Sequence, residues 1–186
     1  MTIGPSHFCE KARWALARAG LPFREEPHPP LVHWLATRRA AGRRQVPLLV
    51  TPSGAYTSLG AILRFCDEHL PESERLVQAG EAAAREVATL EALFDDKLGP
   101  AVRRLAYYHL LPHADVALAV LTAGVPPWER AVFRAGRPLV VRLLRRGLRI
   151  GEESARRSRE RIDAVFADVA QRISGGKPYL VGSRFS

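Results

Sequence analysis

The first 70 residues alternate short β-type runs with helical patterns. Three helices are predicted, each followed by a glycine or proline stop: residues 6–20, 31–42 and 60–70. Four short runs are predicted to be strands: "MTI", "LPFREE", "VPLLV" and "AYTS". The turn "TPSG" joins the last two into a hairpin. The order β-α-β-α-β-β-α predicts an α/β fold in which helices cover a mixed β-sheet.

Beyond residue 75 the apolar positions follow helical spacing only. Residues 80–98 form an amphipathic pattern, which Gly99-Pro100 should kink or break. Further helices are predicted over 101–111, 127–150 and 153–173, followed by a loop. The composition changes near residue 75, so we predict an α/β domain over 1–71, a linker over 72–78 and an all-α domain over 79–186.

Composition narrows the class of protein. The chain has 186 residues, 47% of them hydrophobic, which is enough to build a core. Its two cysteines, Cys9 and Cys66, form no disulfide framework and indicate a reducing compartment, so we expect a cytoplasmic protein. The most apolar stretch, residues 117–128, is interrupted by prolines and is too short to span a bilayer.

The net charge of +9 is concentrated in one region. Residues 134–161 hold ten arginines against three glutamates. Such a stretch can meet phosphates or an anionic membrane surface. We prefer a solvated helix face, with an anionic membrane surface as the alternative, and we do not expect a nucleic-acid partner.

The segment "SHFCEKARWAL" carries the clearest candidate chemistry. Ser6 stands where a helix begins, and Cys9 stands one turn into it. A hydroxyl and a helix N-terminus both favour a thiolate over a thiol. The alternative for Ser6 is a simple N-cap that bonds backbone N–H groups. Arg13 is expected to support the helix and its neighbours.

Four stretches together resemble the cytosolic glutathione transferases: "SHFCEKARWAL", "QVPLLV", "AILRFCDEHLP" and "KPYLVGSRFS". The family joins a thioredoxin-like, glutathione-binding N-terminal domain to a helical second domain. The resemblance implies glutathione as co-substrate, a small electrophile as second substrate, a role in detoxification and a homodimer, with no metal. It also implies that the helical domain is incomplete, because Ser186 would be the N-cap of a further helix.

The resemblance carries specific residues over to this chain. Ser6 matches the hydroxyl that holds the glutathione sulfur, which makes it the predicted catalytic residue. Cys9 is then scaffold, with thiol activity as the minority alternative. Val46 and Pro47 match the cis-proline segment whose backbone binds the cysteinyl part of glutathione. The alternative there is an ordinary trans-proline.

The γ-glutamyl end is where the chain departs from the family. Leu59 stands where the family has a serine, so Thr57 or Ser58 is the candidate substitute near a helix N-terminus. The alternative for Ser58 is an N-cap alone. Tyr107 and Tyr108 are candidates for the electrophile pocket, although helix packing is an alternative.

Two hypotheses therefore remain for the function. One is a glutathione transferase-like enzyme in which Ser6 stabilises the glutathione thiolate for attack on an electrophile. The other is a non-catalytic, transferase-like module for binding or dimerisation that has lost tight glutathione binding. The Leu59 departure supports the second, and the "SHFCEKAR" segment supports the first.

Overall fold

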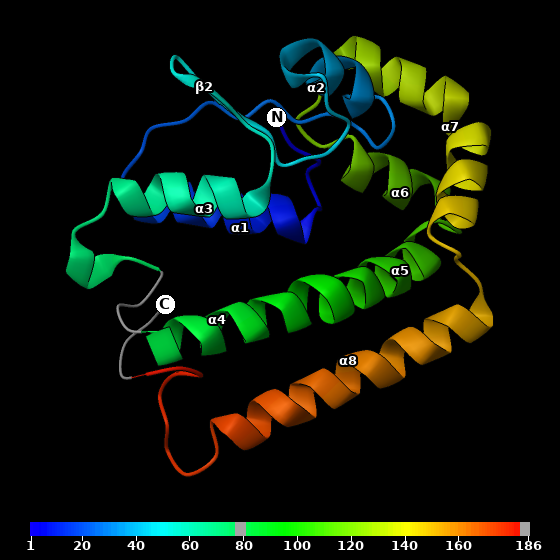
Figure 1. The fold of residues 1–186 in the computed structure, drawn as a ribbon. Helices are drawn as coiled ribbons and strands as arrows, with labels where there is room; N and C mark the ends of the chain where they lie inside the picture. Colours follow the sequence, from blue (N-terminus) through cyan, green and yellow to red (C-terminus); the bar gives the residue numbers. More distant parts are fainter. Residues whose placement is uncertain (77–80, 183–186) are drawn as a thin grey trace. The chain divides into compact units, whose positions relative to one another are not determined.

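The computed structural model describes residues 1–76 and 81–182 (Figure 1). The chain forms two compact units, each assembled from two stretches. The first unit combines Met1–Leu70 with Leu111–Leu144, and the second combines Pro71–Leu110 with Arg145–Ser186. The domain boundaries at 71 and 79 stay a prediction. Part of the predicted linker and the predicted cap at Ser186 lie outside the described residues.

The three helices expected near the N-terminus are confirmed. They are α1 (His7–Arg18), α2 (His33–Ala41) and α3 (Leu59–Glu68). Side-chain caps explain where two of them begin, since Ser6 caps α1 and Ser58 caps α3. Gly42 ends α2 at φ 67°, a left-handed conformation that suits glycine.

The sheet of this unit is smaller than predicted. The hairpin is confirmed as the antiparallel pair β1 (Leu49–Thr51) and β2 (Gly54–Tyr56). The strands predicted at "MTI" and "LPFREE" are wrong. They are replaced by a single parallel bridge between Thr2 and Pro27. The turn at Gly4 stops the first run after three residues, and Pro27 has no N–H to extend the pairing.

Backbone hydrogen bonds still hold these segments in sheet-like order. The N–H of Thr2 donates to the carbonyl of Glu26 at 3.0 Å, and the N–H of His28 donates to the carbonyl of Thr2 at 2.9 Å. On the other side, the terminal ammonium of Met1 donates to the carbonyl of Leu48 at 2.8 Å. Residues 1–2 therefore lie between the segment before α2 and the segment that leads into β1.

Two more helices complete the first unit: α6 (Ala114–Leu121) and α7 (Pro127–Gly147), the latter continuing beyond it. The helix at 127–150 was predicted and is confirmed, with Pro138 accommodated inside it. The helix α6 was not predicted. A buried pair joins this part to the N-terminal stretch, since Nδ1 of His28 lies 2.8 Å and 3.0 Å from the two carboxylate oxygens of Glu129.

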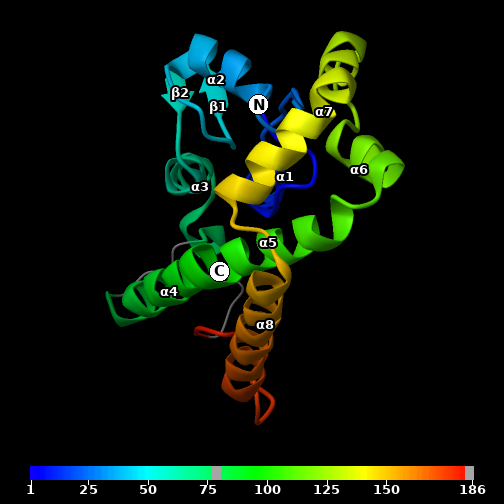
Figure 2. The ribbon, with the colours of Figure 1, turned by 90° about the vertical axis from the view of Figure 1, so that its right-hand side faces the viewer.

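The second unit is helical, and its helices can be followed in Figures 1 and 2. It contains η1 (Glu72–Glu74), α4 (Glu81–Leu93), a π-helical segment η2 (Phe94–Leu98), α5 (Gly99–Leu110) and α8 (Glu152–Arg172). The expected break at Gly99-Pro100 is present as this π segment, in which the N–H of Gly99 reaches the carbonyl of Phe94. Pro100 has no N–H for the carbonyl of Asp96, so the regular α pattern cannot run through it.

The helices α5 and α8 pack on each other in the second unit. Arg104 of α5 donates from Nε to the carbonyl of Leu148 at 2.9 Å and from Nη1 to the hydroxyl of Ser158 at 3.2 Å. These bonds fix the start of α8 beside α5. Among the described residues, no helix has the length and apolar character needed to cross a membrane.

Candidate functional site

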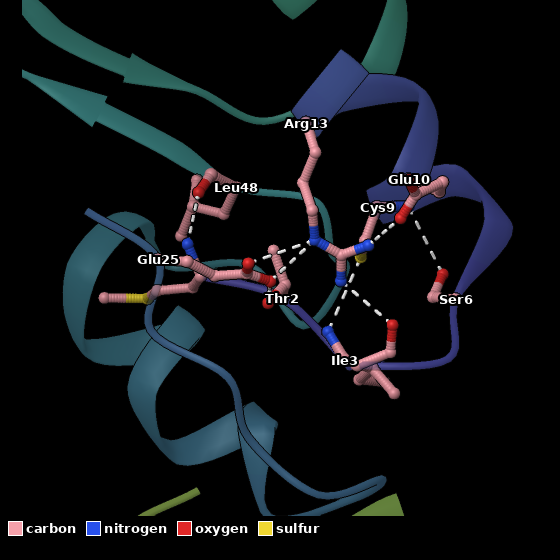
Figure 3. Close-up of polar contacts among 10 residues, drawn as sticks. Thr2, Ile3, Ser6, Cys9, Glu10, Arg13, Glu25 and Leu48 are labelled. Atoms are coloured by element: carbon pink, nitrogen blue, oxygen red, sulfur yellow. Dashed lines mark hydrogen bonds and ion pairs between the residues drawn. The ribbon is translucent and has the colours of Figure 1, made fainter. Parts of the chain in front are cut away.

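Ser6 is the N-cap of α1 and is partly exposed. Its backbone is extended, with φ −82° and ψ 119°, and its hydroxyl oxygen accepts a hydrogen bond from the N–H of Cys9 at 3.5 Å (Figure 3). This long bond uses a lone pair of the oxygen. The hydroxyl also contacts the thiol of Cys9, so a bound sulfur would compete with Cys9 for the O–H proton.

An open pocket of about 500 Å³ lies beside Ser6. It is lined by residues of the first unit: Gly4, Pro5, Ser6, His7, Glu10, Lys11 and Trp14. Ser6 lies where α1 begins, so its hydroxyl and the first N–H groups of the helix are at the same end of α1. The positive end of the helix dipole lies there as well, and it favours an anion.

Arg13 holds the loop that leads to Ser6, which confirms its expected supporting role (Figure 3). One Nη donates to the carbonyl of Gly4 at 2.9 Å. Its Nε reaches both carboxylate oxygens of Glu25 at 2.9 Å and 3.0 Å, and the other Nη contacts Glu10. Burial acts to lower the pKa of Arg13, but the hydrogen bonds that it donates to these carboxylates and their negative charge outweigh burial, so the pKa is raised.

The cysteines lie in the core, as the scaffold interpretation of Cys9 requires. Both Cys9 and Cys66 are free thiols with 0% exposure. Burial raises the pKa of Cys9 despite contacts with Ile3 and Ser6, and burial raises the pKa of Cys66 to about 11. Neither sulfur is a ready nucleophile, because the thiolate is the reactive form.

The Val46–Pro47 peptide bond is cis, as expected from the resemblance. Pro47 is buried and lines a small cavity of about 40 Å³ that Cys9 and Arg13 also line. It does not line the pocket beside Ser6. Cys9 connects the two places, because its N–H faces the hydroxyl of Ser6 and its side chain faces the cavity with Pro47.

Ser58 lies at the exposed start of α3, and its hydroxyl accepts from the N–H of Ala61 at 3.2 Å. The structure therefore shows Ser58 acting as the N-cap of α3. Thr57 precedes it and is partly exposed. Arg64 was missed by sequence reasoning. Its Nη1 lies 3.6 Å from where a Cβ on Gly60 would stand, which brings a cation to the N-terminal turn of this helix.

The tyrosines Tyr107 and Tyr108 lie on α5, in the second unit, and both are partly buried. Burial raises the pKa of Tyr107, although the nearby charge of Arg103 opposes this. Tyr107 is therefore neutral at physiological pH. Across residues 1–76 and 81–182, no group of three or more histidine, cysteine or acidic side chains is arranged to hold a metal ion.

Comparison with known proteins is consistent with this geometry. A search of curated proteins found no match to the chain. Residues 4–74 match the family model of the glutathione S-transferase N-terminal domain. The matched stretch contains α1, the cis-proline segment, the hairpin and α3. This match supports a relationship of the chain to the glutathione S-transferase family, with a thioredoxin-like N-terminal domain.

Proposed function

We propose that the protein is a glutathione transferase in which the hydroxyl of Ser6 stabilises the thiolate of bound glutathione. The observation that carries the proposal is the position of this hydroxyl. It lies at the N-terminus of α1 beside an open pocket, and its lone pair rather than its proton serves the cap. The match of residues 4–74 to the transferase N-terminal domain supports glutathione as the thiol.

The proposed reaction begins with loss of the glutathione S–H proton to solvent. The O–H of Ser6 then donates to the sulfur anion, while the positive end of the α1 dipole lowers its energy. The sulfur lone pair attacks an electrophilic carbon and forms a C–S bond. The electrons of the broken bond leave with the displaced group, or remain on an acceptor that solvent protonates. The buried thiol of Cys9 takes no part.

The start of α3 is the proposed site for the γ-glutamyl carboxylate. The helix begins at Leu59, so the N–H groups of Leu59 and Gly60 have no carbonyl partner within it. The hydroxyl of Thr57 or Ser58 and the cation of Arg64 lie at the same end of the helix. Arg64 thus supplies a charge partner where Leu59 cannot.

Substitutions at Ser6 separate capping from catalysis. Ser6→Thr keeps both the cap and the hydroxyl donor, so it should keep activity. Ser6→Asp keeps the cap but puts a negative charge beside the sulfur, and Ser6→Ala removes both. We expect kcat/KM with a chlorodinitrobenzene probe to fall about tenfold to a hundredfold in Ser6→Ala, and further in Ser6→Asp.

The thiolate itself provides a second readout. Absorbance of bound glutathione near the thiolate band, followed against pH, should show a raised thiol pKa in Ser6→Ala and Ser6→Asp but not in Ser6→Thr. Activity that instead follows helix stability, with Ser6→Asp equal to wild type, contradicts the proposal. The hydroxyl would then be a cap alone.

The second candidate is a non-catalytic binding module, and Leu59 favours it. This side chain holds the first position of α3 and cannot bond a carboxylate. Calorimetric titration of the whole chain with millimolar glutathione distinguishes the two functions. Binding that weakens in Arg64→Gln, with Arg38→Gln of α2 as the matched control, supports the enzyme. No binding to the wild type supports the module.

A further inference from the structure

Helix α7, which bends in its middle where Pro138 lies, exposes large apolar side chains on both of its parts (Figures 1 and 2). Trp128 is 59% exposed, Val132 53%, Leu139 61% and Leu143 47%. On an ideal helix of 3.6 residues per turn these four positions fall within an arc of about 60°, with Trp128 and Val132 before Pro138 and Leu139 and Leu143 after it. The buried positions Glu129, Phe133 and Val140 lie on a different arc of the same helix. The four exposed positions are therefore separate from the face by which α7 packs on its own unit.

The same helix is strongly basic. Its sequence holds six arginines and one acidic residue, Glu129. Glu129 is buried against His28, so it does not offset the exposed cations. Arg142 is exposed, and it lies one helical turn from Leu139 and next to Leu143. Apolar and cationic side chains thus share one side of α7.

We propose that α7 docks the protein onto an anionic lipid surface, with Trp128, Val132, Leu139 and Leu143 entering the boundary of the acyl chains and the arginines meeting lipid phosphates. Helices of this composition lie in the plane of the interface. Tryptophan favours this boundary because its ring is apolar and its N–H is polar. The proposal is independent of catalysis by Ser6.

The composition of α7 argues against two other partners for this face, a second copy of the chain and a nucleic acid. A second copy would bring one arginine-rich helix against another, and like charges across a symmetric interface repel. RNA or DNA would use the arginines but would leave the aliphatic side chains Val132, Leu139 and Leu143 against polar backbone. An anionic bilayer satisfies both kinds of side chain.

The test uses the whole chain with vesicles of phosphatidylcholine containing about 30% phosphatidylserine. We expect the wild type to sediment with these vesicles, to release as salt is raised, and to bind pure phosphatidylcholine poorly. One arginine near such a surface is worth about fivefold in partitioning, so the charge reversal Arg142→Glu should weaken binding about thirtyfold. Leu139→Asp should weaken it comparably.

Matched controls lie on α8. Arg159→Glu makes the same change in net charge, and Phe166→Asp removes an apolar side chain that is 59% exposed. Both should bind vesicles within about threefold of wild type. In a Trp14→Phe/Trp34→Phe background, the remaining Trp128 should show a blue-shifted emission on addition of anionic vesicles, which reports entry into the interface directly.

Four results would overturn the proposal. The first is no binding of the wild type to anionic vesicles at low salt. The second is equal loss of binding in the α8 controls, because net charge alone would then explain it. The third is self-association that Leu139→Asp abolishes without any effect on vesicle binding. The fourth is binding to a mixed-sequence RNA that Arg142→Glu weakens while vesicle binding stays unchanged.

Discussion

The buried contact between His28 and Glu129 should be one of the strongest single ties within the first unit. Their side chains are 10% and 4% exposed, and Nδ1 of His28 lies within hydrogen-bond distance of both carboxylate oxygens. The contact spans 101 positions in sequence and connects the segment before α2 with the first turn of α7. We therefore predict that breaking it loosens α7 from the N-terminal stretch.

The size of the effect follows from burial. The variant Glu129→Ala removes the partner of His28 and leaves its ring in a site that excludes water. Leaving a buried hydrogen-bonding group without its partner costs about 1–3 kcal/mol. A second contribution is lost at the helix itself. Glu129 lies in the first turn of α7, where an acidic side chain interacts favourably with the helix dipole and stabilises the helix by about 0.5 kcal/mol. We expect a loss of about 2–3 kcal/mol in the free energy of unfolding, and a fall in Tm of roughly 4–12 °C.

The double variant His28→Phe/Glu129→Leu provides the control. It removes both polar groups and fills the space with apolar atoms, so it should lose about 1 kcal/mol or less. Urea unfolding at pH 7 of the wild type, His28→Phe, Glu129→Leu and the double variant closes a double-mutant cycle, and the coupling between the positions should be about 1–2 kcal/mol. A single-variant loss below about 1 kcal/mol, or additive single and double variants, would refute the reasoning.

The remaining predictions concern the thiols, the Arg13 network and His33. In native protein at pH 7.5, Cys9 and Cys66 should resist a disulfide exchange reagent that modifies both in urea, because each is buried with a raised pKa; rapid native reaction of Cys9 would contradict the scaffold role. Arg13→Lys should cost about 1–2 kcal/mol in urea unfolding, since lysine cannot reach Gly4 and Glu25 together. Burial lowers the pKa of His33, so stability should fall as pH drops below about 6.5, and His33→Gln should flatten that slope; an unchanged slope would assign the dependence to other groups.

Prediction from sequence worked where the signals were local. Ser6 and Ser58 mark helix starts because a hydroxyl can bond the N–H three residues later. Gly42 marks a helix end because it accepts a positive φ. The hairpin follows from the turn residues between two β-type runs. Each of these features depends on interactions between residues that are close together in the sequence.

Prediction failed where distant segments decide the outcome. The strands expected at residues 1–3 and 21–26 needed partners of matching length, and Pro27 left only a bridge. Helix α6 lies in an apolar run without a polar stripe, so its periodicity carries little information. Glu129 gives no sequence signal for its role, because its partner His28 stands far away in the chain.

The candidate site shows both kinds of information. The cap at Ser6 is local and was visible in the sequence, whereas Arg64 comes to the start of α3 through the conformation of its own side chain. Arg13 lies between these cases. Its place on α1 is local, but its bonds to Gly4 and Glu25 depend on how the following segment returns beside residue 2.

The proposed stabilisation of a thiolate by Ser6 does not compete with its capping role. The cap needs a lone pair on the hydroxyl oxygen, and a bound sulfur needs the hydroxyl proton. Capping and binding of a sulfur anion also depend on the same end of the helix. The N–H groups that require a cap are the ones whose dipoles favour an anion. A hydrogen bond of 3.5 Å to Cys9 is long, so capping holds the oxygen in place without saturating it. The loop fixed by Arg13 can therefore present one hydroxyl for two purposes, and helix stability and activity should separate cleanly among substitutions at this position.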